Sequence, residues 1–350
     1  MADDFKYHIH HHASLVVPPA LAQARLSHAH KEIDDESLAD AVESAISSTL
    51  LRQRRLALSA LSDGEFRRRN DLSVAYDAIE GFSAPGVSTP VAELVGAAHA
   101  AEIRVLLGTP ALRDRLVPEE GAQLGALTHR PTMIALPSPG FLTALTTAPG
   151  QSAGFAEFLR AEILALATEG VDYVLLRNPV LAFLLVAEGR AMAEKLGIDP
   201  ARTIAAILET ETAAVADLDV PENFRVGLDL TSAGHARGPW DRAAVEAFLV
   251  TQPFGRLCVD FPAADSFPLD LVAPGLVLSL GIVDIANAAL EDVDTLVDRV
   301  DEAAKLMDID DIALSTNGGF HVVGAAAASY EQSKLQRVEM VARYFWGNEL

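Results

Sequence analysis

Eight short apolar segments, each followed by a helical pattern, most constrain the fold that this chain can adopt. Strands that alternate with helices are typical of βαβ units and of a parallel sheet. Eight parallel strands are the number that closes a barrel. The sequence therefore predicts a (β/α)8 barrel. The expected strands are residues 9–17, 58–63, 131–137, 171–177, 224–231, 256–261, 276–283 and 311–316.

The helix expected at 292–307 carries the clearest periodicity. Leu296, Val297 and Val300 recur at helical spacing, while Asp294 faces elsewhere. Residues 70–130 are less regular, and we expect them to form an insertion of helices and loops between the second and third strands. Because such insertions usually shape the mouth of a barrel, we expect residues 1–350 to form one domain.

Charge and hydrophobicity limit the partners of the chain. Its 350 residues are half hydrophobic, which is enough to bury a full-sized core. Its 49 acidic and 27 basic residues give a formal charge of −22, which repels phosphate backbones and anionic lipids. We therefore expect neither nucleic acid nor a membrane as a partner.

The single cysteine, Cys258, excludes an intramolecular disulfide and any zinc site that needs two thiolates from one chain. It lies in an apolar strand, where we expect an inert core thiol. The sequence opens on no recognisable signal peptide and contains no apolar run long enough to span a bilayer. The expected compartment is the cytoplasm.

Polar residues gather where the expected strands end, and in a parallel barrel the carboxyl ends of the strands carry the active site. Their number makes this ring the place where function is expected. The ring consists of His10, His11, His12, Ser14, Asp63, Glu65, Ser138, Arg177, Asn178, Asp229, Thr231, Asp260, Asp284 and Asn317.

Six motifs in this order resemble the catalytic barrel of cobalamin-independent methionine synthase and its short single-barrel relatives. The most specific is LSDGEFRR, and the last is LSTNGGF. The resemblance covers nearly the whole chain and implies a barrel of the methionine synthase/uroporphyrinogen decarboxylase-like type. The motifs are HHASLVVPPALAQAR at the start, LSDGEFRR at 61–68, ALPSPGFL at 135–142, LLRNPVLAF at 175–183, GLDLTSAG at 227–234 and LSTNGGF at 314–320.

The zinc-ligand positions depart from this pattern. The family binds zinc through a His, two Cys and a Glu, and the resemblance places Asp229, Thr231, Asp260 and Gly318 at those positions. Thiolate donors are what suit zinc to activate a substrate thiol. We therefore expect no Cys-ligated zinc and no ordinary homocysteine methylation.

The amino-acid pocket departs as well. The resemblance places Arg177 where the family has an Asp that holds the substrate ammonium, and Asn178 where it has a companion acid, whereas Glu65 is kept. Arginine favours a carboxylate or phosphate, so a small anionic substrate is expected. The alternative is an internal ion pair of Arg177 with Glu65, Asp229 or Asp260, because a buried unpaired guanidinium is costly.

The DGE turn also has two interpretations. Asp63 and Glu65 could orient a ligand or act as a general base at the mouth of the second strand. Alternatively, the turn is structural and pairs with Arg67 or Arg68.

The histidine run suggests a metal site of hard ligands. Alternation along a strand sends His10 and His12 to one face and His11 to the other. His10 or His12 with Asp229 and Asp260 would suit iron or manganese. The alternative is a set of hydrogen-bonded or surface imidazoles.

Further polar residues are candidate substrate contacts. No His–Asp pair stands at a spacing that identifies an activated nucleophile, and the signals at His235 and His321 are weak. The expected substrate-binding residues are Ser14, Asp63, Ser138, Asn178, Thr231 and Asn317.

The leading functional hypothesis is a diverged methyl or alkyl transferase that acts on a small acidic or sulfur-containing metabolite without Cys-ligated zinc. Glu65, Arg177, Asp229 and Asp260 are its expected catalytic residues. The alternatives are a repurposed lyase or decarboxylase, a His/Asp metal-dependent oxygenase, and a non-catalytic metabolite-binding protein. Folate use and homo-oligomerisation are left open.

Overall fold

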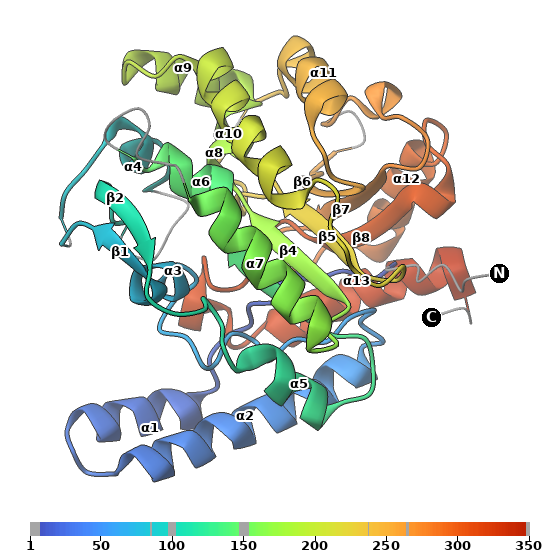
Figure 1. Cartoon of the computed structure of the whole chain (residues 1–350). Helices are drawn as coiled ribbons and strands as arrows, with labels where there is room; N and C mark the ends of the chain where they lie inside the picture. Colours follow the sequence, from blue (N-terminus) through green and yellow to red (C-terminus); the bar gives the residue numbers. More distant parts are fainter. Residues whose placement is uncertain are drawn as a thin grey trace.

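The computed structural model describes residues 8–84, 86–96, 103–146, 154–236, 238–263 and 266–347. Six parallel strands lie at its centre, in chain order from β3 to β8 (Figure 1). Each lies within a range that the sequence predicts, because these segments are apolar runs buried on both faces. The strands are β3 (Met133–Pro137), β4 (Tyr173–Arg177), β5 (Arg225–Asp229), β6 (Arg256–Asp260), β7 (Val277–Val283) and β8 (Ile312–Thr316).

Two further segments close the barrel. Residues 8–14 lie parallel to β8, and residues 58–64 lie between residues 8–14 and β3. The expected eightfold barrel is thus confirmed, although these two segments form isolated bridges instead of the full strands predicted at 9–17 and 58–63. Ala13 has a φ of 63°, which breaks the extended backbone. The bridges join Ile9 to Leu314, Ser14 to Gly64, and Leu61 to Thr132.

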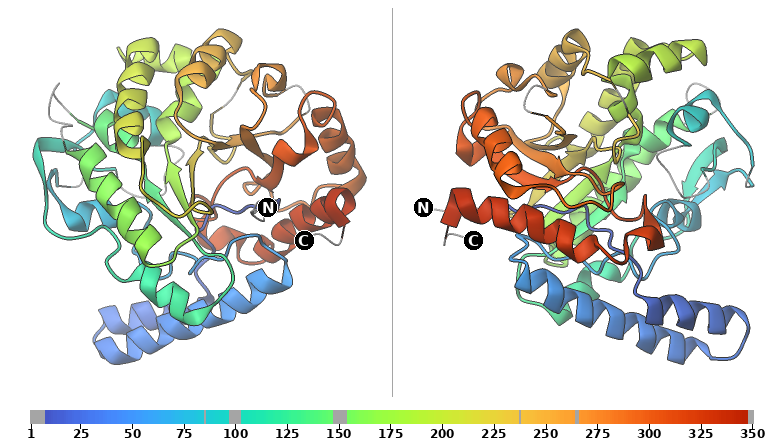
Figure 2. Two further views of the ribbon diagram at one scale, coloured as in Figure 1. Left: turned by 45° about the vertical axis from the view of Figure 1, so that its right-hand side comes forward. Right: turned by 180° about the vertical axis from the view of Figure 1, so that it is seen from behind.

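Helices surround the sheet, and the α1–α2 hairpin projects from one side (Figure 2). In the described residues, no helix is both long and apolar enough to cross a membrane. The helices are α1 (Pro19–Ala29), α2 (Asp35–Arg55), α6 (Pro139–Ala144), α7 (Phe155–Thr168), α8 (Pro179–Leu184), α9 (Ala187–Lys195), α10 (Pro200–Val215), α11 (Arg242–Thr251), α12 (Val293–Ala303), α13 (Glu331–Trp346) and the 3-10 turns η2 (Leu269–Leu271), η3 (Ile309–Asp311) and η4 (Gly324–Ala327).

Helix α12 confirms the periodicity seen in the sequence, although it ends at Ala303 instead of 307. Its N-cap Asp292 accepts a hydrogen bond from the backbone N–H of Thr295 at 3.0 Å. Leu296 and Val300 are buried against the barrel, as expected.

Residues 70–130 contain the expected helices and also an antiparallel pair of strands that the sequence did not indicate. The pair was missed because β1 contains a charge and a glycine, while β2 contains a glycine and a proline, and glycine and proline are poor strand residues. Helix α4 packs against α8 and α9. That 1–350 is one domain stays a prediction. The elements are α3 (Ser73–Ala78), β1 (Ile79–Phe82), α4 (Pro90–Val95), β2 (Leu106–Leu112) and α5 (Glu120–Leu127).

The barrel interior is a small apolar layer of its own. The large apolar cluster lies between the sheet and the helices, whereas Tyr173 and Cys258 belong to a second cluster of seven buried residues. Gly227 allows this packing, because a Cβ there would lie 2.3 Å from the Tyr173 hydroxyl oxygen.

The connection between β6 and β7 contains little helix. In the described part of the chain between β6 and β7, residues 261–263 and 266–276, the 3-10 turn η2 is the one helical element. By contrast, β3, β4, β5 and β7 are followed by α6, α8, α11 and α12.

Candidate active site at the carboxyl ends of the strands

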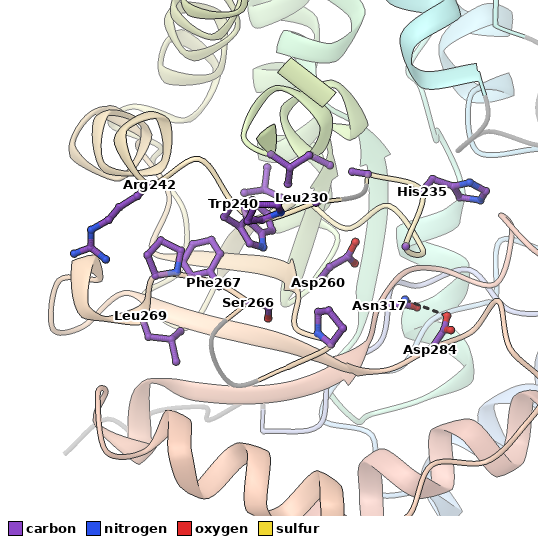
Figure 3. Close-up of a pocket in the computed structure, with 18 of the residues that line it drawn as sticks. Leu230, His235, Trp240, Arg242, Asp260, Ser266, Phe267, Leu269, Asp284 and Asn317 are labelled. Atoms are coloured by element: carbon purple, nitrogen blue, oxygen red, sulfur yellow. Dashed lines mark hydrogen bonds between the residues drawn. The ribbon is translucent and has the colours of Figure 1, made fainter. Parts of the chain in front are cut away.

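Two cavities lie at the strand ends. The larger, here called the open cleft, has a volume of about 1150 Å³ (Figure 3). The smaller, here called the inner pocket, has about 30 Å³, which is room for a water molecule and little more. Residues that line the open cleft include Leu230, Trp240, Asp260, Phe267, Asp284 and Asn317. Residues that line the inner pocket include Arg177, Asn178, Asp229, Thr231, Gly318 and His321.

His12 and Asp229 form a buried pair beside the inner pocket. The Nδ1 atom of His12 lies 2.7 Å from Oδ2 of Asp229, and its Nε2 atom lies 2.8 Å from the carbonyl oxygen of Thr316. A carbonyl only accepts hydrogen bonds, so Nε2 carries a proton, and the carboxylate calls for a second proton on Nδ1. This arrangement suits an imidazolium–carboxylate pair.

Asp229 is held as a carboxylate. Its Oδ1 atom accepts hydrogen bonds from the backbone N–H of Thr231 at 2.9 Å and from the Thr231 hydroxyl at 2.6 Å. Burial raises the pKa of Asp229, but the charge of His12 and the hydrogen bonds from His12 and Thr231 outweigh burial and leave the pKa below its usual value. Asp229 is therefore an anion at neutral pH.

Arg177 takes part in the internal ion pair that was one of its two expected roles. Its Nη1 atom lies 2.8 Å from Oε1 of Glu65, and its Nη2 group donates to the carbonyl oxygen of His12. Of its guanidinium nitrogens, the buried Nε has no hydrogen-bond partner. Two of its three guanidinium nitrogens are thus engaged within the protein, and the binding of an anion by Arg177 stays a prediction.

Glu65 belongs to a larger buried network. Arg68 Nη1 donates to Glu65 Oε1 at 3.0 Å, and the same guanidinium makes a bidentate contact with Glu120, the shortest distance being 2.6 Å. Burial raises the pKa of Glu65, and the charges of Arg177 and Arg68 offset only part of that rise. The structural interpretation of the DGE turn therefore accounts for its contacts: Arg68 pairs with Glu65, and Arg67 Nε lies 3.8 Å from Oδ2 of Asp63.

The turn itself has a strained backbone. Gly64 and Glu65 have φ values of 74° and 62°, and a left-handed glutamate costs about 1–3 kcal/mol. Asp63 holds the turn by accepting the Glu65 backbone N–H at 2.8 Å. Burial, followed by the nearby charge of Glu120, raises the pKa of Asp63 to about 7.

Ser138 and Asn178, predicted as substrate contacts, cap helices. Ser138 accepts from the backbone N–H of Phe141, and Asn178 from that of Leu181, at the first turns of α6 and α8. Both side chains also bond the buried Glu211, with Asn178 Nδ2 at 3.0 Å from Oε1. Ser138 lies outside the lining of both cavities, whereas Asn178 borders the inner pocket.

Asp260 stands apart from the inner pocket and faces the open cleft. Its carboxylate accepts a hydrogen bond from the Ser232 hydroxyl at 2.8 Å. Burial raises its pKa to about 7, so protonated and ionised forms coexist near neutral pH. Figure 3 places its carboxylate between Trp240 and Asn317.

The wall opposite Asp260 is polar as well. Asn317 donates from Nδ2 to Asp284 at 3.2 Å and accepts from the Ile285 backbone N–H at 3.0 Å (Figure 3). Asn317 and Asp284, two members of the expected ring of strand-end residues, thus meet in the open cleft.

A histidine contact that the sequence did not predict ties Ser14 to the loop after β8. His321 Nδ1 lies 2.7 Å from the Ser14 hydroxyl, and its Nε2 lies 3.7 Å from Asp71. The contact needs Gly319, because a Cβ there would lie 2.3 Å from Ser14 Oγ. His321 had only a weak sequence signal, and Asp71 had none because it lies in the irregular insertion.

The histidine run at residues 10–12 follows the predicted alternation. The rings of His10 and His12 are 5.4 Å apart, whereas His11 Nε2 bonds the carbonyl of Ala60 at 2.9 Å. Burial lowers the pKa of His10 well below its usual value and that of His11 to about 4. His10 and His11 are therefore neutral.

Metal ligation by these residues has a specific obstacle. Among the described residues, the group with ligand atoms within 4.8 Å of one another is His10, His12 and Cys258, without Asp229 or Asp260. Both His12 nitrogens are engaged, and burial raises the pKa of the Cys258 thiol, which keeps it protonated. The proposed iron or manganese site at His10, His12, Asp229 and Asp260 stays a prediction.

The zinc that the resemblance implies does not fit these residues. Gly318 offers no side chain, and the Thr231 hydroxyl donates a hydrogen bond to Asp229. Asp229 is bonded to His12, and Asp260 to Ser232. The donors are therefore oxygens that already have partners, without a thiolate.

Comparison with known proteins gives two kinds of result. No family model matches the chain. The uncharacterized protein YxjH of Bacillus subtilis strain 168 is 25% identical over an alignment of 365 residues. The alignment covers 96% of this chain and 94% of that protein.

Solved structures match over most of the chain. The putative vitamin B12-independent methionine synthase of Listeria monocytogenes aligns with a TM-score of 0.75 at 17% identity, over 98% of both chains. The B12-independent methionine synthase of Shewanella sp. W3-18-1, whose structure is a complex with selenomethionine, aligns with a TM-score of 0.68 at 17% identity, over 89% of both chains. The chain therefore has the barrel fold found in these methionine synthase structures.

Proposed function

We propose that this protein is an enzyme that transfers a methyl or other alkyl group between small molecules without a Cys-ligated zinc. The fold shared with methionine synthases supports the reaction class. The residues that the resemblance places at the zinc positions provide no thiolate, which supports a reaction without Cys-ligated zinc. The single observation that carries the proposal is Asp260, a carboxyl group at a strand end that faces a cleft of substrate size.

Asp260 and Asp229 divide the proton chemistry. Two carboxyl groups whose surroundings move their pKa values apart are a common sign of an acid/base assignment. Asp229 stays ionised beside His12, while the pKa of about 7 lets Asp260 accept or donate a proton at neutral pH. After burial and the hydrogen bonds from Ser232, the charges of Asp229 and His12 also act on the pKa of Asp260, and His235 and Asp284 line the same cleft.

In the proposed reaction, the nucleophilic group of the acceptor loses its proton to the Asp260 carboxylate. The freed electron pair forms a bond to the alkyl carbon, and the electrons of the broken bond stay with the leaving group. The proton then passes from Asp260 to water. Because Asp260 acts as the base, we expect the rate to rise with pH through about 7.

The experiment follows an isotopically labelled methyl group by mass spectrometry across a panel of methyl donors and thiol or amine acceptors. The protein is purified without chelator, and bound iron, manganese and zinc are assayed. We expect transfer without bound metal, reduced about 10²- to 10⁴-fold in Asp260→Asn. The control is Asp298→Asn, which makes the same chemical change at an exposed position of α12 outside the cleft lining.

Three results would contradict the proposal. They are transfer by no donor–acceptor pair, full activity in a folded Asp260→Asn protein, and homocysteine turnover with one equivalent of zinc. A lyase or decarboxylase is the second candidate, because protonated Asp260 could equally donate a proton to a carbanion. Release of carbon dioxide or of an elimination product from a small acid would favour that candidate.

A further inference from the structure

The open cleft combines aromatic rings with acidic groups. Trp240 and Phe267 both line it, with ring centroids 4.9 Å apart and planes at 74°. In Figure 3 the two rings lie together on one side of Asp260. Leu230 and Leu269, both buried, complete an apolar wall. Aromatic faces beside a carboxylate are the surroundings that hold organic cations.

The charges of the cleft favour a cation as well. Its arginine and lysine, Arg242 and Lys305, pair with Asp270 and Glu302, and its one histidine is His235. Asp260 belongs to no ion pair in the described part of the chain.

Asp284, likewise, has no ion-pair partner within the described ranges, and its hydrogen bonds come from the neutral donors Asn317 Nδ2 and Ala286 N. The net charge of −22 also attracts cations over a longer range.

We propose that the open cleft binds a methylated organic cation, a sulfonium or quaternary ammonium compound, as the alkyl donor. This inference rests on the proposed function and names its substrate class. In the transfer, the bond from the methyl carbon to sulfur or nitrogen breaks. Its electron pair stays on that heteroatom, which becomes a neutral thioether or amine, while the acceptor gives its proton to Asp260.

The expectation of an anionic substrate depended on Arg177, which borders the inner pocket and pairs with Glu65. That pocket has room for about one water molecule, so of these two cavities the open cleft is the one that a metabolite fits. The two expectations therefore concern different cavities and can be tested side by side.

The test measures binding by calorimetry with three probes of one shape. Choline is the cation, 3,3-dimethyl-1-butanol is its uncharged carbon analogue, and 3,3-dimethylbutyrate is the anion. Trimethylsulfonium serves as a second cation. We expect the cations to bind roughly 10- to 30-fold more tightly than the alcohol, and the anion to bind least. Equal binding of cation and alcohol, tighter binding of the anion, or no binding by either cation overturns the inference.

Two variants locate the site. Trp240→Leu should remove most of the cation affinity, and Asp260→Asn should remove the preference for cation over alcohol. Asp298→Asn, which changes an exposed carboxylate of α12 outside the cleft lining, is the control and should keep both. Thermal unfolding checks that each variant folds, and the three-probe comparison on the unmodified protein stands without them. Cation binding unchanged in folded Trp240→Leu would also overturn the inference.

The outcomes separate the inference from the proposed function. Cation binding without methyl transfer to any acceptor would leave the cation site standing and overturn the transferase. Methyl transfer from a neutral or anionic donor, with no cation bound, would do the reverse.

Discussion

The inner pocket and the open cleft lie at the same end of one barrel, yet they differ in whether their charged groups have charged partners. Around the inner pocket each charged group has a charged neighbour, as in the pairs of His12 with Asp229 and of Arg177 with Glu65. In the cleft, Asp260 and Asp284 have only neutral hydrogen-bond donors among the described residues. A buried charge that is paired within the protein is costly to leave without its partner, whereas a charge open to a cavity remains available to a ligand.

The largest effect on stability is expected in the buried network around Glu65, where charged groups pair with one another. Arg68→Met should destabilise the fold by about 3–5 kcal/mol, because Glu120 would be left buried without its cation and Glu65 would keep only Arg177. The matched control is Arg69→Met, which breaks an exposed pair with Asp77 and should cost about 1 kcal/mol or less. Urea unfolding at pH 7 measures both. Equal losses in the two variants would remove the claim that the buried network stabilises the fold.

A smaller effect, dependent on pH, is expected at Glu211. Burial raises its pKa from 4.5 to about 7, so between these pH values the unfolded chain releases a proton that the folded chain keeps. Stability should therefore fall with rising pH by about 3 kcal/mol across this window, relative to Glu211→Gln, and stay level above it.

Unfolding free energies of the wild type and of Glu211→Gln from pH 4.5 to 8 measure this difference, in which the other buried acids cancel. The control is Glu209→Gln, an exposed residue of the same helix, which should stay within about 0.5 kcal/mol of the wild type throughout. Parallel curves for the wild type and Glu211→Gln would contradict the prediction.

The smallest effect on stability is expected in the cleft. Ala286 is exposed and lines the open cleft, so Ala286→Phe should change stability by about 0.5 kcal/mol or less while occupying the space that a ligand needs. Calorimetry with choline should then detect no binding. Leu290→Phe, at an exposed position outside the cleft lining, should leave binding intact. Undiminished choline binding by Ala286→Phe would place the ligand elsewhere.

The barrel was predictable because its signal is repeated. All six strands from β3 to β8 fall within the expected ranges, since buried parallel strands are continuous apolar runs. The departures are local. Ala13 turns left-handed and breaks the first strand, and the ribbon of β1 and β2 contains residues that disfavour strands.

The partners within the site were harder to predict. The sequence indicated Arg68 as a partner of the DGE turn but not Glu120, which lies 52 residues further on in the irregular insertion. Ser138 and Asn178 looked like substrate contacts because they end strands, yet each precedes a proline that starts a helix, so their side chains serve as caps. Trp240 and Phe267 lie in loops without periodicity, and their meeting depends on tertiary structure alone.

The burial of Cys258 makes its alkylation rate a measure of how often the barrel opens. Its sulfur lies inside the ring of strands, fully shielded, and stays a thiol because burial raises its pKa. Alkylating reagents attack the thiolate, so they can reach this atom only when the strands part. The speed at which iodoacetamide labels the native chain therefore reports how often the barrel opens, without any introduced dye or engineered residue.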